Sequence, residues 1–70
     1  MKFNQWVDDQ GGIEAAADFL KEKPRTVYSW YRFEKPPRFT AALNIVIRTH
    51  GRVDFNGIYG PLAQRLLEAP

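Results

Sequence analysis

The stretch IEAAADFLKEKPRTVYSWYR, residues 13 to 32, contains two helical patterns separated by only three residues. Its first eight residues are rich in alanine, the strongest helix former. They place four apolar side chains on one face: Ile13, Ala16, Ala17 and Leu20. Pro24 then suits the first position of a new helix, because a helix leaves that backbone N–H without a partner. The spacing predicts a helix-turn-helix over about residues 13–32.

The second pattern, over residues 24–32, separates two kinds of side chain. At about 100° per residue, Val27, Trp30 and Tyr31 fall on one side of a helix, which we expect to face the core. The opposite side is polar and charged, and it carries Arg25, Tyr28, Ser29 and Arg32. In a helix-turn-helix, this outer face of the second helix meets the major groove of DNA.

A further helical pattern precedes the pair. Phe3, Trp6 and Val7 recur at the spacing of an amphipathic helix, and the Gly-Gly pair at 11–12 ends it. We expect Trp6, like Trp30, to pack in the core rather than to stack on bases.

The chain after residue 33 predicts a loop and two more helices. EKPPRF (34–39) is a loop, because a residue before proline avoids the helical region. RFTAALNIVIRT (38–49) predicts a helix closed by Gly51, although its β-branched part NIVIRT also fits a strand. The residues of this helix that are expected to face a core are Phe39, Ala42, Leu43, Val46 and Ile47. RVDFNGIYGP (52–61) is interpreted as turn-rich, with room for one helical turn, and PLAQRLLEAP (61–70) as a short final helix.

These patterns predict one all-α domain over residues 1–70, with four to five short helices around one core. A chain this short buries only about 60% of its unfolded surface. It has no cysteine, which excludes a disulfide or a thiolate zinc site. It also lacks the roughly 20-residue apolar run of a membrane span and the apolar segment of a signal peptide. We therefore expect a cytoplasmic protein with no membrane partner.

Charge is concentrated in one part of the chain. Residues 21–38 hold six basic and two acidic side chains, a net charge of +4, whereas the rest carries −2. A local basic block in a nearly neutral chain indicates an anionic partner, most simply nucleic acid. On charge alone, the basic block fits a solvated charged surface as well as it fits a nucleic-acid binding site.

The sequence gives no indication of catalysis. It contains one histidine, no cysteine and no glycine-rich phosphate-binding loop. Asp8 and Asp9 are adjacent in a predicted helix, so their carboxylates diverge. We expect no catalytic residue, no metal site, no cofactor and no small-molecule substrate.

Residues 11–39, GGIEAAADFLKEKPRTVYSWYRFEKPPRF, resemble the helix-turn-helix of small phage and prophage regulators. The resemblance is to the Cro/repressor (Xre-like) class, especially its YdaS-like branch. Those proteins commonly carry Gly-Gly, an alanine-rich helix, Thr-Val-x-x-Trp in the recognition helix, and a proline-containing loop before a further helix. TVYSW at 26–30 is the most specific part, and the resemblance covers roughly residues 11–50. It implies a Cro/repressor-like fold that binds DNA.

Two features depart from that pattern. The family usually has glycine where Lys21 stands and an aliphatic residue where Glu22 stands, so we expect a non-standard turn. Its recognition helix usually begins with a serine or threonine cap, and here Lys23 occupies that position. A missing cap costs about 1 kcal/mol. A lysine beside a helix N-terminus can, however, contact a phosphate.

The resemblance implies roles for individual side chains. Base reading falls to the groove-facing positions Arg25, Tyr28, Ser29 and Arg32. Phosphate contacts fall to Lys23, Thr26, Lys35 and Arg38. A bidentate arginine–guanine pair provides about 1–3 kcal/mol of discrimination. The alternative is that the arginines are solvated helix charges and that Tyr28 covers neighbouring surface.

The expected function is sequence-specific binding of duplex DNA by a phage-type transcriptional repressor in a bacterial host cell. One module reads few bases, so we expect a homodimer on two half-sites about 34 Å apart. The candidate dimerisation tail is 53–68, through Phe55, Ile58, Tyr59, Leu62, Leu66 and Leu67. Equally, these residues can close the core of a monomer.

Two other functions fit the same sequence. An excisionase, or recombination directionality factor, would bind tandem direct repeats rather than inverted half-sites. A protein-interaction module, such as an antitoxin or anti-repressor, can inherit the fold without binding DNA.

Overall fold

The computed structural model describes residues 1–68, so the last two residues of the predicted domain and of its final helix lie outside the described part. The helices are α1 (Phe3–Gln10), α2 (Ile13–Leu20), α3 (Pro24–Tyr31), α4 (Phe39–Arg48) and α5 (Phe55–Glu68). Residues 1–68 contain no strand. The predicted all-α fold with a helix-turn-helix is confirmed, and the strand alternative for NIVIRT is excluded because residues 44–48 belong to α4 and Thr49 is its C-cap.

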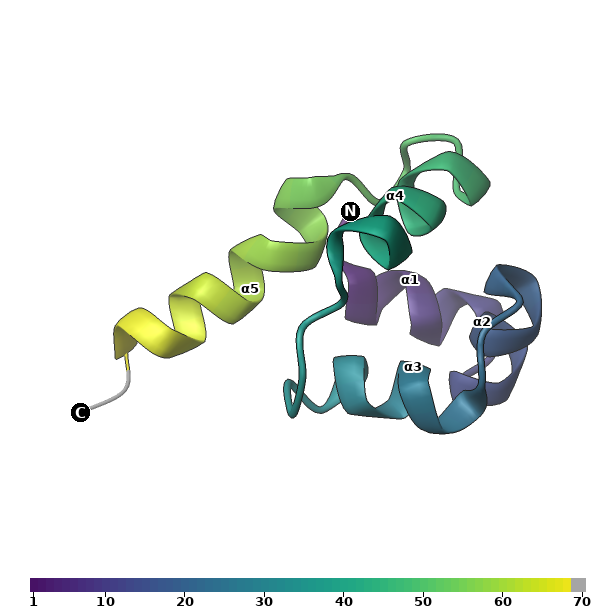
Figure 1. The fold of residues 1–70 in the computed structure, drawn as a ribbon, viewed down its shortest axis with the longest axis horizontal. Helices are drawn as coiled ribbons and strands as arrows, with labels where there is room; N and C mark the ends of the chain where they lie inside the picture. The colour runs from purple at the N-terminus through teal and green to yellow at the C-terminus, as the bar shows by residue number, and fades with distance from the viewer. Residues whose placement is uncertain (69–70) are drawn as a thin grey trace.

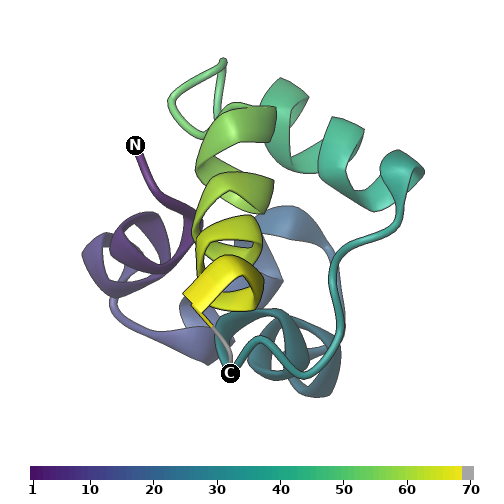
Figure 2. The same ribbon diagram turned by 90° about the vertical axis from the view of Figure 1, so that its left-hand side faces the viewer.

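The helices form a compact body with one projecting element. In Figure 1, α4 lies above and α3 below the pair α1 and α2, while α5 runs away from the body toward the left. The molecule therefore measures 35 × 22 × 21 Å. Figure 2, seen along the projecting helix, places α5 between the levels of α3 and α4. No helix within residues 1–68 is long and apolar enough to cross a membrane.

The core lies where α2 packs against α1, α3 and α4. Ala16 and Ala17 are fully buried, and their small side chains let the neighbouring helices approach closely. Larger residues complete the core: Phe3, Trp6, Val7, Leu20, Val27, Trp30, Ile45, Val53 and Ile58. The prediction that both tryptophans pack inside is confirmed, since both are buried, and the Phe3 ring centroid lies 6.0 Å from that of each indole.

Four of the helices end in the same way. The first residue beyond α1 and α2, and the second beyond α3 and α4, takes a left-handed conformation, and two backbone N–H groups bond back to carbonyls of the last turn. These residues are Gly11, Lys21, Phe33 and His50, with φ of 106°, 58°, 60° and 55°. Gly51 takes part in closing α4 as predicted, since its φ is 78° and its N–H bonds to the Val46 carbonyl (2.9 Å), and His50 before it is also left-handed.

The register of α4 differs from the prediction. Ala42 and Ile45 are buried and Val46 is half-buried, but three residues assigned to the core are exposed: Phe39, Leu43 and Ile47. The buried Thr49 extends the inner face, and its hydroxyl accepts a hydrogen bond from the Val53 N–H (3.2 Å). The buried Val53 amide is thereby paired, as buried backbone donors usually are.

The interpretation of residues 52–61 as turns with at most one helical turn is wrong, because α5 begins at Phe55 and continues through Pro61. The Asp54 carboxylate caps this helix by accepting a hydrogen bond from the Gly57 N–H (2.7 Å). Gly57 is buried, and a Cβ at this position would collide with the carbonyl oxygen of Met1. The glycine therefore permits close packing inside a helix rather than a turn.

Candidate nucleic-acid interface

Helix α3 presents the predicted base-reading residues to solvent. Arg25, Tyr28 and Arg32 are exposed and Ser29 is half-buried, while Val27 and Trp30 face the core. The helix ends at Tyr31, one residue before the predicted end, and Arg32 is its C-cap.

Tyr31 is half-buried and contacts α1 rather than the outer face of α3. Its hydroxyl donates to the Asp8 carboxylate (2.9 Å), and this hydrogen bond raises the pKa of Tyr31. Because Tyr31 packs toward α1, it does not add to the exposed face of α3 that carries Arg25, Tyr28 and Arg32.

A groove runs between α3 and the beginning of α4. Its wall on α3 contains Arg25, Thr26 and Ser29, and its opposite wall contains Lys35 and Arg38. The structure therefore brings together five of the eight predicted DNA-contacting residues. Glu22 is the one acidic residue among those lining the groove, beside three basic ones.

The other three predicted residues lie outside this groove. Tyr28 and Arg32 occupy the neighbouring part of the exposed face, where the guanidinium carbon lies 5.8 Å from the centre of the tyrosine ring. Such a contact holds the arginine over the aromatic ring and orients it. Lys23 is exposed at the N-cap of α3.

The electrostatics at the two helix starts favour an anion. The N-cap residues of α3 and α4 are Lys23 and Arg38, and neither side chain caps its helix. Each helix N-terminus carries about half a positive charge, and a basic cap adds to it. Because residues of both first turns line the groove, a phosphate there would receive several favourable interactions at once.

The loop that carries Lys35 is fixed by α5. Pro37 in this loop is buried, and its carbonyl oxygen accepts a hydrogen bond from the Tyr59 hydroxyl (2.6 Å). This contact was not predicted, because it depends on α5 starting before residue 59. It gives the C-terminal helix a part in shaping the groove.

The predicted dimerisation tail divides into two parts. Ile58 is only 5% exposed and belongs to the core, so its assignment to an interface is wrong. Tyr59 is half-buried against the loop, and Leu62 is also half-buried. Phe55, Leu66 and Leu67 remain exposed.

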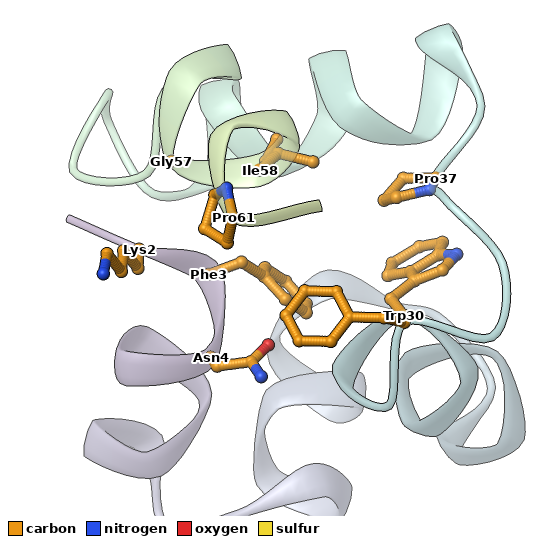
Figure 3. Close-up of a pocket in the computed structure, with 9 residues that line it drawn as sticks. Lys2, Phe3, Asn4, Trp30, Pro37, Gly57, Ile58 and Pro61 are labelled. Atoms are coloured by element: carbon orange, nitrogen blue, oxygen red, sulfur yellow. The ribbon is translucent and has the colours of Figure 1, made fainter. Parts of the chain in front are cut away.

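A second concave site lies beneath α5. It is a cavity of about 220 Å³, lined mainly by apolar side chains that include Phe3, Trp30 and Ile58 (Figure 3). Lys2 is its one titratable residue, so the lining offers no acid–base pair. Within residues 1–68, no three histidine, aspartate or glutamate side chains are grouped to hold a metal.

Comparison of the chain with family models, with curated proteins and with solved structures gives no match. Function must therefore be inferred from the charge, shape and position of the groove beside α3.

Proposed function

We propose that the protein binds duplex DNA sequence-specifically, with α3 lying in the major groove. The observation that carries this proposal is the convergence of Arg25, Lys35 and Arg38 on one groove between α3 and α4. An α-helix fits the major groove of B-DNA, which is about 12 Å wide. The phosphate backbone beside the helix then lies where the loop residues present their charges.

Base reading and phosphate binding fall to different parts of this surface. Arg25 and Arg32 offer bidentate donors to guanine, and Ser29 bonds to a base or phosphate. The Tyr28 ring orients Arg32 and can contact a thymine methyl. Phosphate contacts come from the helix starts and the loop, through Lys23, Thr26, Lys35 and Arg38.

The biological role that fits such a module is a transcriptional repressor of the phage Cro-like type, acting in the bacterial cytoplasm. Occupation of a promoter by the protein blocks polymerase, so repression needs neither catalysis nor a cofactor. Two copies on inverted half-sites double the number of bases read.

The test compares Arg25→Ala with Arg52→Ala. Both changes remove one exposed positive charge, but Arg52 lies in the α4–α5 connection, outside the residues that line the groove. Arg25→Ala is expected to weaken specific binding by about 1–3 kcal/mol and to relax the preference at one base pair. Arg52→Ala should leave that preference intact.

Fluorescence anisotropy with specific and scrambled duplexes measures both effects, and thermal unfolding shows that each variant is folded. Equal losses in the two variants would mean that charge alone holds the DNA, and the assignment of α3 as the reading helix would be wrong.

A further inference from the structure

Two apolar helix faces that the core leaves uncovered meet where α4 and α5 begin. On α4 the uncovered face consists of Phe39, Leu43 and Ile47, and on α5 of Phe55, Leu62 and Leu66. The rings of Phe39 and Phe55 join the two faces, stacked with centroids 5.9 Å apart and planes inclined by 9°. The helices diverge from this junction (Figure 1). We call these six residues the α4–α5 apolar surface.

Solvent reaches much of this surface. Phe39 is 67% exposed, Ile47 64% and Leu66 69%. Single exposed apolar residues are ordinary, but six on two adjoining helix faces present on the order of 500 Å², a size typical of functional patches. One side of a stable protein–protein interface covers about 800 Å². The six side chains therefore supply most of the area that one partner of a stable dimer needs.

The apolar surface leaves the basic groove free. On α4 the groove is lined by Thr40 and Ala41, at the start of the helix. Phe39 and Leu43 lie on the side of α4 opposite Ala41, and Ile47 lies about two turns beyond Thr40 along the helix. Arg38 directly precedes Phe39 and lines the groove. A partner that covers the apolar surface would therefore lie beside the groove without blocking it.

We infer that the partner is a second copy of this chain, packed so that the two-fold axis passes near the stacked Phe39 and Phe55. A two-fold contact brings each patch against itself, so a charged patch would meet like charges. None of the six residues is charged, and this cost is absent. The inference rests on the proposed function in one respect: two copies joined here would place two basic grooves side by side for one duplex.

The first test is the oligomeric state of the Ile47→Glu variant, with Ala15→Glu as the control. The control places the same carboxylate on an exposed site of α2, away from the apolar surface. In sedimentation over a micromolar concentration series, the wild type and Ala15→Glu should reach twice the 8.1 kDa chain mass. Ile47→Glu should remain a monomer and keep its helical circular dichroism.

A second test locates the axis. Since the chain has no cysteine, a single Phe39→Cys change reports only contacts at the junction. Mild oxidation should link two copies of this variant, but not copies of an Asp9→Cys variant on α1.

The inference is overturned if the wild type is monomeric both free and on DNA, or if the dimer survives Ile47→Glu. DNA binding is judged separately. A monomeric Ile47→Glu that still recognises one half-site supports both proposals. A dimer that recognises no sequence supports the interface and contradicts the proposed function.

Discussion

Lys21 combines a lysine side chain with a backbone conformation that favours glycine. Its φ of 58° and ψ of 42° close α2 and start the turn toward α3. A non-glycine residue pays about 1 kcal/mol for this left-handed geometry. Lys21→Gly should therefore raise the free energy of unfolding by up to about 1 kcal/mol, measured by urea titration.

The matched control at this position is Lys21→Ala. Alanine keeps the left-handed strain but removes the charge, so it should give no comparable gain. If alanine stabilised the fold as much as glycine, the lysine charge rather than the backbone would be the unfavourable feature of the turn.

At the scale of elements, the packing of α5 depends on Gly57 but not on Gly60. Gly57→Ala should destabilise the protein by about 1–3 kcal/mol, because its Cβ meets the Met1 backbone and something must shift. Gly60 lies in the same helix, and a Cβ there meets the Asn56 side chain at 3.2 Å.

Gly60→Ala should be neutral or stabilising by up to about 1 kcal/mol, since alanine favours the helix and the Asn56 side chain can move. Thermal unfolding of the two variants measures the contrast. Equal effects would show that α5 does not pack against the N-terminal segment as described.

The same helix shows how far sequence reasoning extends. Helices α1 to α3 follow from periodicity, because each has one clear apolar face and a recognisable start or stop. The start of α5 was missed because Gly57, Gly60 and Pro61 resemble turn residues, although Asp54 is a good N-cap signal. The register of α4 was ambiguous because apolar residues occur on more than one of its faces.

The candidate site was also predictable only in part, because periodicity reports which way a helix face points but not which distant segments pack beside it. Periodicity along α3 identifies Arg25 and Ser29 as outward-facing, and the structure places them so. It does not reveal that Lys35 and Arg38 fold back opposite them. The loop that brings Lys35 there is held by the Tyr59–Pro37 hydrogen bond, a contact 22 residues apart that no local pattern encodes.

For the whole molecule, the uneven charge predicts a specific response to salt. If Lys23, Lys35 and Arg38 each neutralise one phosphate, a plot of log binding constant against log salt should have a slope of about −3 per half-site. Lys35→Ala should reduce the magnitude of this slope by about 1 and weaken binding to all sequences similarly. A loss confined to one sequence would instead make Lys35 a base-reading residue.

The most direct test of the central claim is selection of bound duplexes from a random DNA pool at physiological salt, followed by sequencing, with Arg25→Ala in parallel. The account predicts an enriched palindrome with half-sites centred about 34 Å apart for the wild type, and a degenerate base in each half-site for the variant. Enriched direct repeats would support the directionality factor instead. No enrichment of any sequence would contradict specific DNA recognition by α3.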